Sequence, residues 1–245
     1  LPISQEILIK NIDKTYAIIV FDIDKFRIIN DLYGSEEGDR VLKFIGDILK
    51  DNISETYLYC RMYADNFAIL MEYKNDTDFA LLAITISEEI TKYPIGLELI
   101  LSLGVCKVDD HDIAVTTLCD RASLAKKTVK GNVVQLLAFY DEAMRERDIE
   151  DKVIENEMTL ALENDEFTMY LQPKVSIEST EVVGAEALAR WIHPLKGVIT
   201  PARFIPLFEK NGFIVKLDYY IWEKAFSTIS KWIDEGHKPV PIDRK

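Results

Sequence analysis

Charged side chains that could carry chemistry stand at two places in the sequence. Asp22 lies near the end of the apolar run at 16–23, and Asp65 stands at the tip of a predicted hairpin. Further along, Glu186 and Arg190 lie on one face of a predicted strand, because alternate residues of a strand share a face. An acid and a guanidinium on one face can serve a metal ion and a phosphate. Structural roles are the alternative: a helix N-cap for Asp22, a turn acid for Asp65 and a surface ion pair for the strand.

The elements that must position the first of these groups are predicted from hydrophobic periodicity and turn residues. In chain order they are a strand at 16–23, helices at 25–32 and from Glu37, a hairpin at 57–73 whose strands flank residues 63–66, a helix at 76–93, a strand at 97–108, a helix at 112–128 and a strand at 133–141. This order implies a central sheet with helices packed on it. The first module therefore covers residues 1–141.

A charged segment without proline or glycine follows at 142–165, and its apolar residues recur at helical intervals, which predicts a linking helix. The second module covers 166–245. Its predicted elements are strands at 166–175 and 181–191, a helix that begins at Thr200-Pro201 and ends at Gly212, and a final helix at about 215–235.

Composition excludes several classes of function. Asp and Glu number 42 against 29 Lys and Arg, so binding to a nucleic acid polymer is not expected, and a phosphorylated ligand needs a local site with a cation. Cys60, Cys106 and Cys119 are isolated in apolar runs, which is typical of reduced core residues in a cytoplasmic protein. No apolar run approaches ~18 residues, so no membrane segment is expected here. The abrupt start suggests a fragment of a longer parent, with room for an N-terminal sensor or membrane domain.

Two stretches of the sequence resemble known families. FDIDKFRIINDLYGSEEGDRVL (21–42), followed by RMYADNFAIL (61–70), resembles the GGDEF domain, the bacterial diguanylate cyclase module. YLQPKVSIESTEVVGAEALARWIHP (170–194), with TPARFIPLFEKNG behind it, resembles the opening of an EAL domain, the cyclic di-GMP phosphodiesterase module. The resemblance implies an α+β fold with a GGDEF-type, mostly antiparallel central sheet flanked by helices. A linking helix and an incomplete EAL-type (β/α) barrel follow, since a whole barrel takes at least about 200 residues.

The resemblance to the GGDEF family implies a nucleotide site in the first module. Joining nucleoside triphosphates is phosphoryl transfer, so the triphosphate must be neutralised by Mg²⁺ (or Mn²⁺) held on hard oxygen ligands. The implied metal ligands are Asp22, the Ile23 carbonyl and Asp65, and the implied nucleotide contacts are Asn30, Asp39, Arg27 and Lys127.

The sequence departs from this family at the hairpin tip. Tyr63 and Ala64 replace the two glycines of the motif, and Asn66 replaces the acid after the metal ligand. A Cβ at the glycine positions intrudes on space for the nucleotide, and a backbone conformation that suits only glycine would be strained. Asn66 cannot supply a charge or accept a proton, and Gly131 stands where the family has a phosphate-binding arginine. Catalysis at Asp65 is therefore not expected, whereas binding of GTP is.

In the second module, the resemblance makes Glu186 the acid of the Glu-Ala-Leu motif, a metal ligand in the catalytic site. It places Arg190 on a substrate phosphate and Gln172 near the site. The other family ligands and the general base would lie beyond Lys245, which itself stands near the position of a family asparagine. With one metal ligand and no general base, this chain alone is not expected to hydrolyse a phosphodiester.

The sequence thus predicts a bacterial, cytoplasmic cyclic di-GMP signalling protein. Its degenerate GGDEF module senses GTP or mediates dimerisation, and its EAL module hydrolyses cyclic di-GMP to pGpG in the intact parent. The expected partners are GTP or cyclic di-GMP and a second copy of the chain. Two alternatives stay open: a weak but active diguanylate cyclase, and a signalling scaffold that binds no nucleotide.

Overall fold

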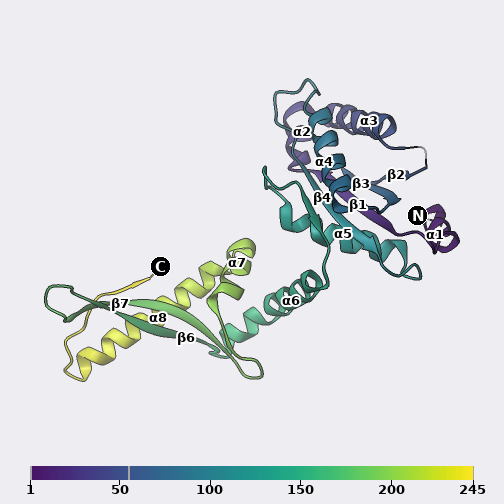
Figure 1. The fold of residues 1–245 in the computed structure, drawn as a ribbon. Coiled ribbons are helices and arrows are strands. Elements are labelled where there is room, and N and C mark those ends of the chain that lie inside the picture. The colour runs from purple at the N-terminus through teal and green to yellow at the C-terminus, as the bar shows by residue number, and fades with distance from the viewer. Residues whose placement is uncertain (1, 55, 245) are drawn as a thin grey trace. The chain divides into compact units, whose positions relative to one another are not determined.

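The computed structural model describes residues 2–54 and 56–244, and the chain divides into two compact units between Arg145 and Glu146 (Figure 1). Each unit has its own sheet and its own hydrophobic core. Among the helices of these residues, none combines the length and the apolar character needed to cross a bilayer.

The first unit is built on a five-stranded sheet with the order β2-β3-β1-β4-β5. The strands are β1 (Tyr16–Ile23), β2 (Leu58–Tyr63), β3 (Asn66–Glu72), β4 (Leu101–Val108) and β5 (Leu137–Phe139). Neighbouring strands are antiparallel except β4 and β5, which are parallel. β1 is the central strand and all of its residues are buried, which explains why its sequence is an almost continuous apolar run.

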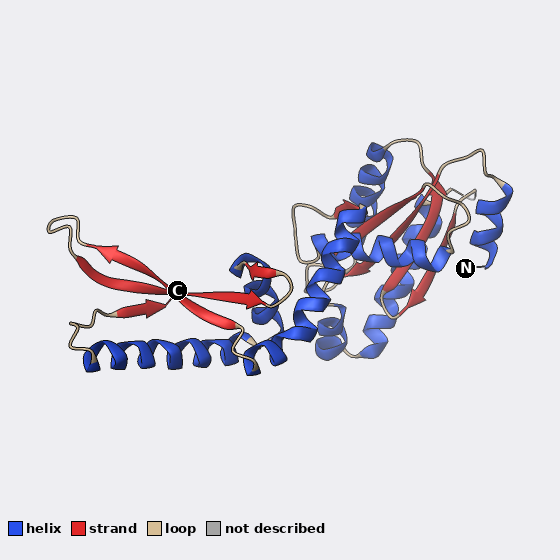
Figure 2. Cartoon of the chain, turned by 90° about the horizontal axis from the view of Figure 1, so that it is seen from below, coloured by secondary structure: helices blue, strands red, loops and turns tan. Residues whose placement is uncertain are grey.

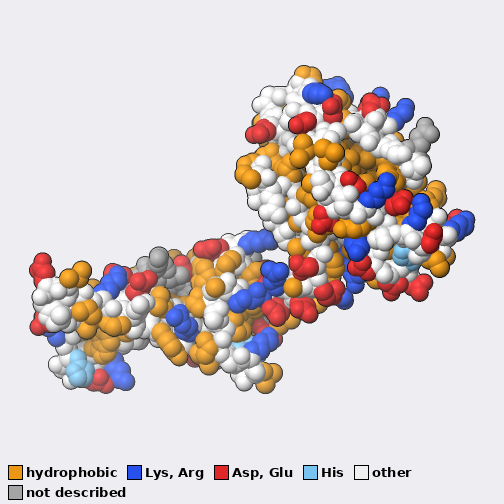
Figure 3. All heavy atoms as spheres, viewed as in Figure 1, with side chains coloured by type: hydrophobic (Ala, Val, Ile, Leu, Met, Phe, Trp, Pro, Cys, Tyr) orange, Lys and Arg blue, Asp and Glu red, His pale blue; other side chains and the backbone are white. Residues whose placement is uncertain are grey.

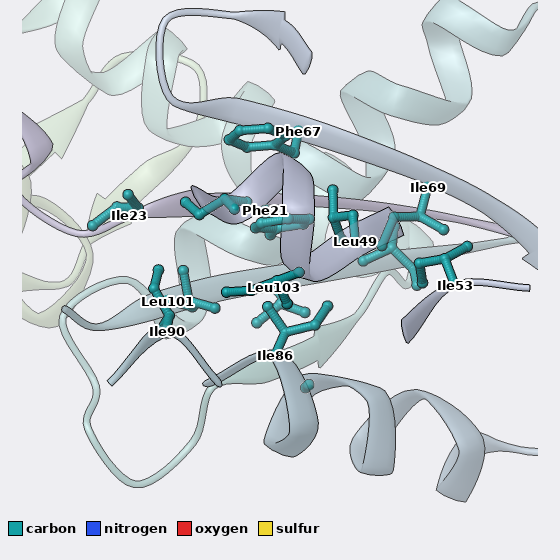
Figure 4. Packing of buried hydrophobic residues seen from close by; sticks show 14 of the residues in the cluster. Phe21, Ile23, Leu49, Ile53, Phe67, Ile69, Ile86, Ile90, Leu101 and Leu103 are labelled. Carbon is teal, nitrogen blue, oxygen red and sulfur yellow. The ribbon is translucent and has the colours of Figure 1, made fainter. Parts of the chain in front are cut away.

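Helices cover both faces of this sheet (Figure 2). They are α1 (Pro2–Lys10), α2 (Phe26–Tyr33), α3 (Ser35–Asn52), α4 (Asp76–Ile90) and α5 (Val115–Val129). Because alternate residues of a strand face opposite sides, β1 contributes to two cores. Phe21 joins a core with Leu49 of α3 and Ile86 of α4 (Figure 4), whereas Ile18 and Val20 join a second core with α1 and α5.

The second unit has a four-stranded sheet and a separate aromatic core. Its elements are α6 (Glu142–Glu163), which begins before the boundary, β6 (Phe167–Val175), β7 (Val182–His193), β8 (Gly197–Ile199), α7 (Pro201–Asn211), α8 (Ile214–Asp234) and β9 (Ile242–Arg244). β7 pairs with β6 and β8 as antiparallel neighbours and with β9 as a parallel one. The Phe167 and Trp191 ring centroids lie 5.0 Å apart, and Phe204 and Phe208 contact both rings. The part of the chain that the structure describes contains no closed barrel, as predicted.

The differences from the sequence-based prediction are local. The strand expected at 97–108 begins only at Leu101, the strand expected at 133–141 shrinks to β5, and α1 was not predicted. The four-residue hairpin tip was wrong, because Tyr63 and Asn66 pair across the strands and leave a two-residue turn. Ala64 closes this turn with a positive φ of 46°.

The cysteines follow the prediction only in part. All three thiols are free, and Cys106 and Cys119 are buried as predicted. Cys60 is exposed, because it lies on β2, which forms the edge of the sheet. An apolar sequence run therefore did not identify a core position on this edge strand.

Candidate functional site

A cleft of about 610 Å³ opens at the end of β1 in the first unit. Five of the residues marked by the GGDEF resemblance line it: Ile23 of β1, Arg27 and Asn30 of α2, Asp39 of α3, and Asp65 of the hairpin turn. The fold thus brings together groups from four structural elements. The volume is in the range of small-molecule sites, about 300–1,000 Å³.

The tight junction of α2 and α3 presents Asn30 and Asp39 to this cleft. Gly34, with a φ of 88°, ends α2 and starts α3. A side chain at Gly38 would overlap the Asn30 amide, so a glycine there leaves room for the Asn30 side chain. An amide and a carboxylate on neighbouring helices offer a donor and acceptors, the groups that can read the edge of a purine base.

The hairpin turn forms another wall of the cleft. Ala64 has the left-handed conformation, and its carbonyl accepts a hydrogen bond of 2.6 Å from Arg61 Nε. This conformation costs a residue with a Cβ about 1–2 kcal/mol relative to the right-handed one. Tyr63 is 63% exposed, whereas Ala64 lines the cleft. Of the two residues that replace the glycines of the motif, Ala64 is therefore the one that borders the space for a ligand.

Beneath the cleft, the buried carboxylate of Asp22 is held by two lysines. Its Oδ2 accepts hydrogen bonds from Lys126 Nζ at 2.9 Å and from Lys130 Nζ at 2.7 Å. Lys126 Nζ also donates to Asn66 Oδ1 at 2.6 Å. Lys126 and Asp22 are both buried, and Lys130 is partly exposed. Asp22, Lys126 and Lys130 thus form an ion-paired cluster of one carboxylate and two ammonium groups.

Lys126, which reaches Asp22, was not among the predicted site residues. It lies on the buried face of α5 with Ala122 and Val129, whereas Lys127, the expected phosphate contact, is the next residue and is exposed. Spacings of four and three residues put these side chains on one helix face. The sequence does contain this signal: Lys126 interrupts the apolar stripe of a predicted helix. A charge inside such a stripe needs a buried partner.

Close packing of α5 on β4 brings Lys126 to the end of β1. A Cβ at Gly104 of β4 would overlap the backbone of α5 at the Ala122 carbonyl and the Lys126 amide. Glycine at this position therefore permits a helix-to-strand distance that a side chain would not. Because β4 pairs with β1, the last turn of α5 comes within hydrogen-bond reach of Asp22.

Two further acids complete the charged cluster. Asp24 accepts hydrogen bonds from Ser102 Oγ at 2.7 Å and from the Gly131 backbone amide at 2.6 Å. Burial raises the pKa of Asp65, and the negative charge of Asp22 raises it further. Burial alone would lower the pKa of Lys130, but its hydrogen bond to Asp22 and the surrounding acids outweigh burial and raise it. Lys130 is therefore charged at neutral pH.

This arrangement does not fit a divalent ion on Asp22. Asp22 Oδ2 already has two ammonium partners, and only its Oδ1 is buried without a hydrogen-bond partner. Two unit charges 4 Å apart interact by about 4 kcal/mol at an effective dielectric constant of 20, and a dication doubles each interaction. Repulsion by the two ammonium groups therefore opposes the attraction of the neighbouring acids. A divalent ion on Asp22 would have to displace these two partners and also lose part of its hydration shell.

No group of three or more acidic, histidine or cysteine side chains that could hold a metal ion occurs in residues 2–54 and 56–244. GGDEF and EAL domains are generally dependent on a divalent metal. The predicted ligand Asp22 thus has protein cations as partners where a metal ion was expected.

In the second unit, Glu186 lies in a row of polar residues across three strands. It is directly opposite Gln172 of β6 and Asp243 of β9. Lys174 Nζ binds Asp243 Oδ2 at 2.6 Å, and this hydrogen bond raises the pKa of Lys174, with a smaller contribution from Glu186. Gln172 therefore lies beside Glu186, and Asp243 is a neighbour that the sequence analysis did not single out. The position predicted for Lys245 lies outside the described residues.

Arg190 lies on the same face of β7 as Glu186. Ala187 and Trp191, at alternate positions, are buried in the aromatic core, so Glu186 and Arg190 belong to the opposite face. The Arg190 guanidinium lies over the Tyr170 ring, 5.6 Å from its centroid. The strand thus presents an acid and a positioned cation on its side away from the core.

On the face of the molecule shown in Figure 3, acidic and basic side chains are interspersed. Lys126 and Lys130 therefore place two positive charges close together at one site, although the chain as a whole has a net charge of −13. The two units thus carry two separate groups of charged side chains, one at the cleft of the first unit and one on the strands of the second.

Comparison with protein families gives the same two domains. Residues 3–133 match "Diguanylate cyclase, GGDEF domain", and residues 155–243 match "EAL domain". The chain belongs to the GGDEF family of diguanylate cyclase domains, and part of an EAL domain follows in the same chain. The resemblance noted in the sequence is thereby confirmed.

Curated relatives cover the whole tandem. The "Bifunctional diguanylate cyclase/cyclic di-GMP phosphodiesterase MucR" of Pseudomonas aeruginosa is 29% identical over 229 residues, 92% of this chain and 33% of the relative. The "Cyclic di-GMP phosphodiesterase PdeR" of Escherichia coli is 28% identical over 226 residues, 90% of this chain and 34% of the relative. The chain thus spans about a third of the length of these relatives.

Solved structures confirm the fold class. A Vibrio cholerae LapD structure, "S helix-GGDEF-EAL (bound to c-di-GMP)", matches with a TM-score of 0.51 and 18% identity over 93% of this chain and 54% of that one. The diguanylate cyclase SiaD of Pseudomonas aeruginosa, in complex with its activator SiaC, matches with a TM-score of 0.51 and 21% identity over 57% and 56% of the two chains. The predicted α+β fold with an incomplete EAL barrel is therefore correct.

Proposed function

We propose that the first unit binds GTP without converting it to cyclic di-GMP and serves as a regulatory module of a cyclic di-GMP signalling protein. The observation that carries this proposal is the cleft itself. Asn30 and Asp39 meet there, next to an Asp22 carboxylate that two lysines already neutralise. The residues suited to binding the base are in place, whereas those suited to the chemistry are changed.

The polar side chains at the cleft have different roles in this proposed function. Asn30 and Asp39 hydrogen-bond the guanine edge. Arg27, whose contact with Asp31 is long at 3.6 Å and exposed, is available for the phosphates, as is Lys130. In the family, a divalent ion neutralises the triphosphate. Asn66, an amide bonded to Lys126, cannot take a proton from an attacking hydroxyl, so the bound nucleotide is not consumed.

The second unit contributes Glu186 to a phosphodiesterase site in a longer protein that contains a complete EAL barrel. There it would hold a metal ion, with Arg190 on a phosphate of cyclic di-GMP and Gln172 beside it, and the product would be pGpG. Support comes from the row of Gln172, Glu186 and Asp243, and from relatives named as cyclic di-GMP phosphodiesterases. Glu186→Gln in such a longer protein should abolish hydrolysis while the first unit still binds GTP.

Calorimetric titration of the chain with GTP tests the first part. Asp39→Asn removes a charged acceptor from the cleft and should weaken GTP binding by about tenfold or more, since a hydrogen bond to a charged group contributes about 1.5–3 kcal/mol. Asp47→Asn, at an exposed position on the same helix α3, is the matched control and should bind as the wild type does. ATP should bind more weakly than GTP.

The same samples decide between the alternatives. Chromatography after incubation with GTP should show no cyclic di-GMP. Formation of cyclic di-GMP that depends on Asp65 would instead identify a weak cyclase. Absence of GTP binding would identify a scaffold, and sedimentation would then show whether this unit acts by dimerisation.

A further inference from the structure

Lys126 is a buried cation at the centre of the charged cluster. Its side chain is 7% exposed, and its ammonium group lies between the Asp22 carboxylate at the end of β1 and the Asn66 amide at the start of β3. Lysines are almost never buried to this degree unless they are paired. Gly104 lets α5 pack closely on β4, and this packing brings the ammonium to this point.

We propose that the Lys126 ammonium is a resident cation that takes the place of a divalent metal ion at Asp22. The cleft above it accordingly accepts the phosphates of a nucleotide without a metal ion. The second statement rests on the GTP binding proposed above, whereas the first concerns Asp22 and Lys126 alone.

The neutral side chain of Asn66 fits this role of Lys126. Asn66 Oδ1 supplies the second acceptor that a buried ammonium needs, and it adds no negative charge. An acid at this position would add a further negative charge to a cluster that already contains Asp22, Asp24 and Asp65. The lysine on α5 and the amide on the hairpin therefore form one arrangement, in which Asp22 is neutralised by the chain.

Lys130 is the group that meets the phosphates. It lines the cleft, its side chain is 46% exposed, and it shares Asp22 Oδ2 with Lys126. When Lys130 turns toward a phosphate, Asp22 keeps its bond to Lys126. The cleft can thus offer a cation to a ligand without leaving a buried carboxylate unpaired.

Manganese titration of the wild-type chain, without nucleotide, is the first test. Electron paramagnetic resonance should show no Mn²⁺ bound by the first unit, and neither Mg²⁺ nor Mn²⁺ should change its thermal transition. Binding of Mn²⁺ that Asp22→Asn abolishes would overturn the proposal. This measurement needs no variant to fold other than that control.

Removal of the lysine should create the metal dependence that the wild type lacks. Lys126→Met leaves a buried carboxylate with one exposed partner and should lower the transition of the first unit by about 10 °C. Mn²⁺ should then restore part of this loss. Lys50→Met, at an exposed position in the last turn of α3, should change neither the transition nor its response to Mn²⁺. A Lys126→Met chain that is folded and indifferent to Mn²⁺ would count against the proposal.

GTP titration with and without Mg²⁺ tests the second statement. The affinity in EDTA should lie within about twofold of the affinity in Mg²⁺, and Lys130→Met should weaken binding by about tenfold, the loss of about 1.4 kcal/mol. Binding that requires Mg²⁺ would overturn metal-free recognition. If GTP binds in neither buffer, the proposed function fails, and the manganese titration still decides the role of Lys126.

Discussion

Substitution of Gly104 by alanine tests whether close helix packing delivers Lys126 to Asp22. The added Cβ would overlap backbone atoms of α5 at Ala122 and Lys126, and backbone cannot rotate away as the end of a side chain can. Overpacking of a core costs about 1–3 kcal/mol, and breaking a buried ion pair costs about 3–5 kcal/mol. Because α5 must move and the pair must lengthen, Gly104→Ala is expected to destabilise the first unit by about 3 kcal/mol or more.

The distribution of tryptophan gives this experiment an internal reference. All three tryptophans, at positions 191, 222 and 232, belong to the second unit, so their fluorescence follows that unit alone. In urea titrations, Gly104→Ala should lower the urea concentration at which the first unit unfolds, as circular dichroism shows. The urea concentration at the midpoint of the tryptophan fluorescence transition should stay unchanged.

Gly46→Ala on α3 is the matched control for the same chemical change. A Cβ at Gly46 meets nothing within 4 Å, and alanine is the better helix former, so this variant should gain about 0.5–1 kcal/mol. The reasoning would be refuted if Gly104→Ala unfolded within about 0.5 kcal/mol of the wild type, the range of neutral surface substitutions.

Three further predictions concern other positions. The pKa of Asp65 is raised, so the folded state binds its proton more tightly than the unfolded state does, and stability is lost as the pH rises above the ordinary value of 3.8. Asp65→Asn should therefore stabilise the first unit more at pH 7 than at pH 3. Urea titrations at the two pH values measure this, and an equal effect at both would contradict it. Burial raises the pKa of Cys106 and Cys119 to about 11, so iodoacetamide at neutral pH should label only Cys60, as mass spectrometry can show, unless the chain is unfolded. His193 Nδ1 accepts two backbone hydrogen bonds, and its Nε2 lies 3.1 Å from a glutamate oxygen of α6. His193→Ala should lower the free energy of unfolding of the second unit, followed by tryptophan fluorescence, by about 1–3 kcal/mol. An unchanged free energy of unfolding would show that these hydrogen bonds do not stabilise the unit.

Much of the fold could be predicted from hydrophobic periodicity. The buried strand β1 and the stripe of α3 were recognised because every residue, or every third and fourth residue, faces a core. The lengths of β4 and β5 and the presence of α1 could not be predicted, because they depend on contacts with partners distant in sequence. The two-residue turn at Ala64 was missed because a non-glycine residue rarely takes a positive φ.

The site was predictable where it follows short motifs. Asn30, Asp39 and Asp65 were implied by the resemblance to the GGDEF motif, and the structure gathers them at one cleft. Lys126 was not singled out, because one residue of helical phase separates a buried position from an exposed one, and the phase is set by packing on β4. The neighbours of Glu186 depend on strand register in the same way.

The most direct test of the resident cation is a crystal of the chain soaked with Mn²⁺ and GTP and measured at the manganese absorption edge. The proposal predicts GTP in the cleft, no anomalous peak at Asp22, and Lys126 Nζ still bound to Oδ2. An anomalous peak that bridges Asp22 and the triphosphate, with Lys126 displaced, would contradict it.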